Sequence, residues 1–287
     1  MSIPLFNPVF HGFQAAVGAL ILRAIHRIGT HALTNGPLWA AGILAAVGEV
    51  VGVPFYITLP LLGGAYYLVA DGRRVLGVVA ALVFVAMVIF FWSSPGWQAI
   101  QPDLLPQDVA LRTASLPDLF LSGLRSGLLT FGGAYTVIAF LQHDAVNVQN
   151  WMTNAQFLDG LALSGILPAP LIIFATFVGY FAGGPLGALI ITAAIFLPAF
   201  AFTLIGHNAL ERAIESRKLH AFLEGVTAAV VGLMAVTTAR LLVAGIDDWP
   251  SLGIFAAALG AVYLWKSRLA IVSIVLSSGL AGLVLLR

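Results

Sequence analysis

Two interruptions fall inside apolar stretches of this sequence, and both consist of residues that break membrane helices. The first is Phe131-Gly132-Gly133 and the second is Pro168-Ala169-Pro170. Glycine frees the backbone from the restriction of a Cβ atom, while proline removes an amide donor and restricts the residue before it. Irregular backbone at membrane depth is tolerated only where it is buried in protein or lines a wet cavity. Paired interruptions of this kind indicate the binding site of a transporter.

The composition excludes a soluble protein. Hydrophobic residues make up 60% of the chain and charged residues 9%, and the mean hydropathy is +1.02. The apolar segments have helix length and lack the alternation of a barrel wall, so we expect an all-α polytopic membrane protein with about eight spans. The net charge of +1 gives no footprint for nucleic acid, and no cysteine is present for a disulfide, a catalytic thiol or a metal site. We expect no cofactor and no bound metal.

Short turns and one polar linker separate the predicted membrane segments. The linker covers Ser93–Leu116 and contains three prolines, and residues His207–His220 form a charged amphipathic stretch. Thr153 and Gln156 have the spacing of a capping box, and Gly183-Gly184-Pro185 should end one helix and open the next. The predicted segments are Pro8–Ile28, Leu38–Val53, Phe55–Ala70, Val75–Trp92, Pro117–Val146, a helix from Thr153 to Ala182 broken at Leu167–Pro170, Pro185–Gly206, Ala221–Val243, and two more on either side of Lys266-Ser267-Arg268.

The first segment recurs 213 residues later. Gly12, Ala15-Ala16-Val17 and Arg27 correspond to Gly225, Ala228-Ala229-Val230 and Arg240, and two short apolar segments follow each copy. Placing the cation-bearing loops on the cytoplasmic side gives the two copies opposite orientations, because an odd segment separates them. Inverted repeats with broken helices are typical of alternating-access transporters.

This repeat divides the chain into three parts. Residues 1–70 are expected to be the tail of a first transporter half with three membrane segments, 71–116 an extra membrane helix with a polar linker, and 117–287 the second half. Subtracting 213 from Phe131 or Pro168 gives positions before Met1. We therefore expect a carboxyl-terminal portion of a longer protein, or a short form that needs a partner.

The second half resembles the long-chain chromate ion transporters. The resemblance rests on Ser126–Tyr135, Trp151, Asp159–Leu163, Leu167–Leu171 and Phe177–Tyr180. It implies a multi-pass secondary carrier of the inner (plasma) membrane, built of two inverted halves, which exports chromate or the related sulfate and so confers chromate resistance. Many family members have glycine and an acidic residue where this chain has Ala169 and Gly165.

A tetrahedral dianion needs positive potential and hydrogen-bond donors, which helix amino ends supply. We expect the helices that resume after Gly133 and at Pro170 to bind it. Arg125 lies in an apolar helix about two turns before the glycines and is the expected cationic side chain, and two hydroxyls lie beside the same interruption. The predicted substrate-binding residues are Arg125, Thr130, Phe131, Gly132, Gly133, Tyr135, Pro168, Ala169 and Pro170.

Other ionisable residues in apolar segments are candidates for coupling or gating. Asp159 could bond Arg125, carry a proton or cap a helix, and His143 could titrate near neutral pH or lie at a wet helix end. Arg240 and Arg27 are expected to be interfacial anchors or guards of the path, and Glu49 and Glu224 are candidate buried acids. The predicted coupling or gating residues are Asp159, His143, Asp144, Glu224 and Arg240.

Two alternatives to a carrier were open. An intramembrane enzyme would need His-Glu-x-x-His or Gly-x-Ser-Gly, and Ala162-Leu163-Ser164-Gly165 lacks the first glycine of the latter, so the sequence predicts no enzyme. The second alternative is a non-transporting fragment or subunit that needs a partner half. The predicted function is alternating-access transport of chromate or sulfate across a lipid bilayer, as a homodimer or with a partner chain, and without nucleic acid.

Overall fold

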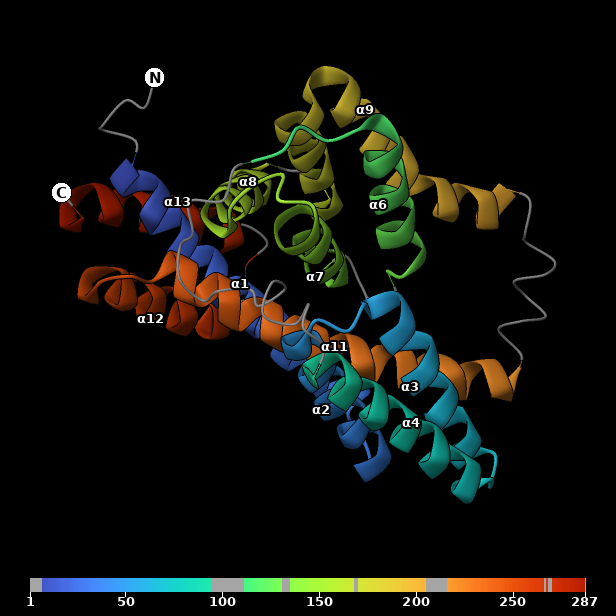
Figure 1. Ribbon diagram of the computed structural model, residues 1–287. Coiled ribbons are helices and arrows are strands. Elements are labelled where there is room, and N and C mark those ends of the chain that lie inside the picture. The colour runs from blue at the N-terminus through green and yellow to red at the C-terminus, as the bar shows by residue number, and fades with distance from the viewer. Residues whose placement is uncertain are drawn as a thin grey trace.

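The computed structural model describes residues 7–93, 111–130, 135–167, 170–204, 216–265, 267 and 270–286. Within these ranges the chain forms helices and turns and no strand, which confirms the predicted all-helical class (Figure 1). The helices are α1 (Asn7–Ala32), α2 (Gly36–Val51), α3 (Phe55–Ala70), α4 (Arg74–Ser93), α6 (Leu116–Leu128), α7 (Thr136–Gln142), the π-helical turn η1 (His143–Val148), α8 (Asn154–Ile166), the 3₁₀ turn η2 (Leu171–Ile173), α9 (Phe174–Leu204), α11 (Arg217–Gly245), α12 (Trp249–Leu264) and α13 (Ala270–Leu285).

Helix length separates two kinds of apolar element. Among the described residues, α1, α4, α11 and the run Leu171–Leu204 are long and apolar enough to cross a membrane. Helices α2, α3, α12 and α13 have 16 residues each. Each is therefore about 24 Å long, below the roughly 30 Å of a hydrocarbon core. The sequence predicted that each of these segments crosses the membrane completely. Each helix is shorter than a straight span requires.

Local sequence explains where these helices begin and end. Gly52 ends α2 in the left-handed conformation, with φ of 83°, and Pro54 precedes α3. The capping box of Thr153 and Gln156 is present at the start of α8, as predicted. Several predicted boundaries were too tight, because α1 continues to Ala32 and α11 begins at Arg217. Residues 94–110 and 205–215, which hold most of the predicted linker and part of the amphipathic stretch, lie outside the described ranges.

Gly183 and Gly184 divide α9 into two helices that fold back on each other. Both glycines have non-helical backbone angles, and φ of Gly184 is +64°. The hydroxyls of Thr176 and Thr192, one from each arm, are 2.7 Å apart. The predicted end near Ala182 and restart at Pro185 are therefore confirmed.

Both predicted interruptions coincide with helix boundaries. The first segment stops at Leu128 and resumes at Thr136, while α8 stops at Ile166 and a 3₁₀ turn begins at Leu171. Five of the predicted site residues lie outside the described ranges: Phe131, Gly132, Gly133, Pro168 and Ala169.

Helices α1 and α11 run antiparallel through the middle of the molecule (Figure 1). Each packs mainly on the two helices that follow the other one in the chain. Helix α1 contacts α12 and α13, whereas α11 contacts α2 and α3. A Cβ atom on Gly12 would meet the backbone of Ser278, and one on Gly225 would meet the backbone of Gly63. Helices α6 to α9 gather on one side of the central pair, and α7 and α8 reach it.

Candidate functional site

A cavity of about 520 Å³ lies between α1, α7, α8 and α13 and borders both interruptions. Tyr135 lines it immediately after the first interruption. Leu167 lines it before the second interruption, and Pro170 and Leu171 line it afterwards. The amino ends of two helices, α7 and the run that begins with η2, therefore face one space. The sequence predicted both helix starts as anion-binding candidates, and the binding of an anion there stays a prediction.

The cavity wall is mainly apolar and carries a few polar groups. The hydroxyl of Tyr135 makes no hydrogen bond within the described part of the chain, whereas Ser164 donates to the carbonyl of Gly160 at 2.8 Å. Gly165 also lines the cavity and has open space where a Cβ atom would lie. An apolar pocket with few, placed polar groups is the usual form of a small-ligand site.

Two cations of α1 follow its cavity-lining residues Leu20 and Ile21, although neither cation lines the cavity. Arg23 and Arg27 are the cations whose field acts on the Tyr135 phenol. Arg23 lies over the ring of Tyr263, 5.8 Å from its centroid, and the Tyr263 hydroxyl is 2.7 Å from Nδ1 of His26. Sequence reasoning missed Arg23 as a site residue, although its spacing of four from Arg27 places both on one helix face.

Two predicted anion-binding residues lie elsewhere. Arg125 is exposed, does not line the cavity, and sits 5.7 Å from the centroid of the Tyr56 ring. Thr130 donates its hydroxyl to the carbonyl of Ser126, one turn earlier in α6. Only Tyr135 and Pro170, of the described predicted binding residues, contribute to the cavity wall.

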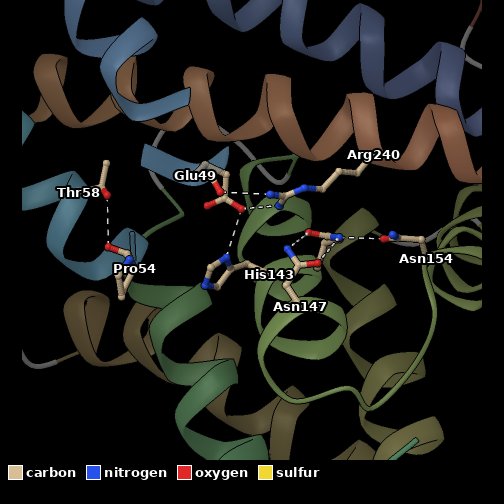
Figure 2. Close-up of polar contacts among 8 residues, drawn as sticks. Glu49, Pro54, Thr58, His143, Asn147, Asn154 and Arg240 are labelled. Carbon is tan, nitrogen blue, oxygen red and sulfur yellow. Dashed lines mark hydrogen bonds and ion pairs between the residues drawn. The ribbon is translucent and has the colours of Figure 1, made fainter. Parts of the chain in front are cut away.

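A second polar site joins α2, α11 and η1 (Figure 2). Nη1 of Arg240 is 2.7 Å from Oε1 of Glu49, and Nδ1 of His143 is 3.3 Å from the same oxygen. Nη2 of Arg240 also donates to the backbone carbonyl of Glu49 at 3.1 Å. Arg240 therefore neutralises the carboxylate and binds a carbonyl at the end of α2, where the helix dipole is negative.

This site is buried and leaves one oxygen unused. The exposed fractions are 3% for Glu49, 6% for Arg240, 8% for His143 and 5% for Asp144. Oε2 of Glu49 has no hydrogen-bond partner within the described ranges. We refer to Glu49, His143, Asp144 and Arg240 as the ion cluster.

Three predictions for the coupling residues need correction. Arg240 is not an interfacial anchor, because it is buried and paired with Glu49. Glu224 is exposed and is not a buried acid. Asp159 accepts a hydrogen bond from Gln14 at 2.7 Å, so its bond is to α1 and not to Arg125. His143 and Asp144, predicted from sequence, both belong to the ion cluster.

Comparison with known proteins gives a consistent family. The sequence model described as chromate transporter matches residues 117–283. The chain is 49% identical to the chromate transport protein of Pseudomonas aeruginosa, over 95% of this chain and 65% of that protein. It is 33% identical to the chromate transport protein of Cupriavidus metallidurans, over 56% of this chain and 40% of the relative. It is 25% identical to the probable chromate transport protein of Synechococcus elongatus, over 96% of this chain and 68% of the relative.

The chain thus spans slightly less than two thirds of the Pseudomonas relative. No solved structure matches it. The long apolar helices, the two interruptions and the match over more than half of the chain agree. This chain belongs to the chromate transporter family, a family of membrane transporters and not of enzymes.

Proposed function

We propose that the chain is a secondary carrier that exports chromate, or the related oxyanion sulfate, across the inner (plasma) membrane by alternating access. The observation that carries this proposal is that residues next to both helix interruptions border the same cavity. Interrupted helices that converge at membrane depth are the usual binding sites of secondary carriers.

The cavity supplies what a tetrahedral dianion needs. Two helix amino ends face it, and such ends offer free amides and a positive dipole. Arg23 and Arg27 add positive potential near Tyr135, whose hydroxyl is free to donate within the described part of the chain. The mainly apolar wall strengthens these interactions, because charges attract more strongly at low dielectric constant.

The helix arrangement supports two inverted halves. Helices α1 and α11 are antiparallel and pack on exchanged partners, and α2 and α12 have the same length at an offset of 213 residues. We infer that residues 1–70 and 117–287 belong to opposite halves, with 71–116 between them. Movement of α6 to α9 relative to the central pair then exposes the cavity to each side in turn.

The test is uptake of radiolabelled chromate into everted membrane vesicles that contain this chain alone, with excess sulfate as competitor. We expect saturable uptake that sulfate suppresses. The Arg23→Gln and Tyr135→Phe variants should lose most of it while inserting normally, and Arg125→Gln should lose less because Arg125 is not among the cations that act on Tyr135. If Arg125→Gln loses most of the uptake while Arg23→Gln and Tyr135→Phe keep it, the binding site lies outside this cavity.

A second candidate is a subunit that needs a partner half, because the chain spans only 65% of the Pseudomonas relative. In that case well-inserted protein shows no uptake by itself. Co-expression of the part of that relative which this chain does not cover should then restore uptake. Absence of uptake under both conditions would overturn the transport proposal.

A further inference from the structure

The ion cluster is separate from the cavity, and none of its four residues lines the cavity wall. Its charges come from three elements: Glu49 from α2, Arg240 from α11, and His143 with Asp144 from η1. The edge of the Phe55 ring in α3 meets the His143 ring, with 5.1 Å between centroids. The imidazole is thus held between a carboxylate and an aromatic ring.

A charge count shows that the cluster has room for one proton. Glu49 and Asp144 are buried acids, and Arg240 is a buried cation paired with Glu49. Arg125 of α6 acts on Asp144 from an exposed position, and Ser122 of the same helix lies beside that carboxylate. With both acids ionised, the buried groups carry one net negative charge when His143 is neutral, and one proton on the cluster, at Asp144 or at His143, removes it. A net charge in an apolar interior is costly, so the proton neutralises the site.

The geometry of His143 suits reversible protonation at one nitrogen. Nδ1 faces Glu49 and donates to it in both charge states. Nε2 makes no hydrogen bond within the described part of the chain, and the side chain keeps 10% of its exposure. A proton therefore has a vacant nitrogen that is not fully enclosed, on the side chain whose charge ordinarily changes near neutral pH.

One continuous helical segment links this histidine to the cavity. Tyr135 and Ile138 line the cavity at the start of α7, and α7 passes directly into η1, which begins at His143. Gln142, fully buried, bonds Asn147 and Asn154 across the π-helical turn. A shift of the segment at His143 is therefore transmitted to Tyr135.

Building on the proposed carrier function, we propose that His143 is a proton-binding site whose protonation is coupled to oxyanion binding in the cavity. The imidazolium strengthens the bond to Glu49 and holds α7 and η1 against α2 and α11. Loss of the proton from Nε2 leaves a buried net negative charge and favours separation of η1 from Glu49. Protonation of the cluster then controls the position of the segment that carries Tyr135.

The direct test is the titration of ¹⁵N-labelled histidines by NMR, with the purified chain in lipid nanodiscs. His143→Gln, which can keep the hydrogen bond to Glu49 but cannot gain a proton, identifies the signal of His143. His220→Gln is the matched control, because His220 is exposed on α11. We expect His143 to titrate reversibly between about pH 5 and 9. A single protonation state throughout that range would overturn the proposal, whether or not the chain transports.

The coupling is tested by adding sulfate to the same nanodiscs in weakly buffered solution and recording the pH. We expect a change in bound protons in the wild type and in His220→Gln, and none in His143→Gln. By reciprocity, the sulfate affinity of the wild type should change about tenfold across the titration, while that of His143→Gln stays constant. Sulfate binding with the same proton change in His143→Gln contradicts the inference but leaves the carrier function intact. Absence of sulfate and chromate binding in the wild type contradicts the carrier function itself.

Discussion

Asn35 and Asp248 cap two helices in the same way, although 213 residues separate them. Asn35 accepts a hydrogen bond from the amide of Leu38 at 3.0 Å, and Asp248 accepts one from Ser251 at 2.7 Å. Their backbone angles are nearly equal, with φ of −145° and −138° and ψ of 166° and 169°. In each case proline is the second helical residue and the helix has 16 residues. The same local signals thus begin α2 and α12.

The cap at Asp248 should depend on pH. The amide of Ser251 donates to this exposed carboxylate, and the Ser251 hydroxyl donates to the backbone carbonyl of Asp248. These contacts with Ser251 lower the pKa of the carboxyl below the ordinary value of 3.8. Its stabilising effect is therefore complete above that value and is lost as the pH falls through the lower folded-state pKa. Asp248→Asn keeps the cap without the charge. Thermal unfolding between about pH 3 and 6 should show a difference between the two chains that shrinks at acid pH, and a constant difference would contradict this.

Removal of the Glu49 carboxylate should destabilise the protein strongly. Glu49→Gln leaves Arg240 buried without its counter-charge, a situation that typically costs about 3–5 kcal/mol. Thermal unfolding in detergent measures the loss, with Glu224→Gln as an exposed control. The double variant Glu49→Gln, Arg240→Met removes both charges and should recover much of the stability. If it is as unstable as Glu49→Gln alone, the unpaired charge is not the cause.

Two glycines should not tolerate a side chain: Gly12, where α1 packs on α13, and Gly225, where α11 packs on α3. Alanine at Gly12 would overlap the carbonyl of Ser278, and alanine at Gly225 would lie 2.7 Å from Cβ of Tyr66 and 3.0 Å from Cα of Gly63. We expect each variant to lose about 1–3 kcal/mol of unfolding free energy. Gly253→Ala, where the space is open, should gain up to about 1 kcal/mol from helix propensity. Equal effects at all three positions would disprove the close approach.

Gly165 offers a way to fill the cavity without disturbing the fold. It lines the cavity, and among the described residues no atom outside its own helix turn lies within 4 Å of the position of a Cβ atom. Gly165→Leu should therefore abolish chromate uptake and leave the unfolding temperature unchanged or higher, because leucine favours helix over glycine. Gly253→Leu should keep normal uptake, because Gly253 does not line the cavity. Normal uptake by Gly165→Leu would show that the oxyanion does not use this space.

Local signals in the sequence predicted local structure well. The Thr153 cap, the Gly183-Gly184 turn and the Pro54 boundary were all predicted, because each depends on the conformational limits of a few neighbouring residues. The offset of 213 residues likewise follows from a repeated pattern of small residues. The two interruptions predicted where helices stop, since glycine and proline act on their own backbone.

Partners of the charged residues could not be predicted in the same way. Glu49 and Arg240 are 191 positions apart, and Gln14 and Asp159 are 145 apart. Such pairs depend on which helices cross, and helical periodicity alone gives a face but not the neighbour that covers it. Arg125 illustrates the failure, because its helix turns that side chain toward Tyr56 and away from the cavity.

The exchange of packing partners has a consequence for the order of folding. Helix α1 is synthesised well before α12 and α13, yet it packs chiefly on these two helices, and α13 begins only at Ala270. At about 5–20 residues per second, α1 waits roughly 10–50 s in the bilayer before those surfaces exist. Gly12 and its neighbours meanwhile face lipid or other chains. Emergence of α13 from the ribosome, and not the insertion of α1, therefore sets the earliest moment at which α1 can complete its packing.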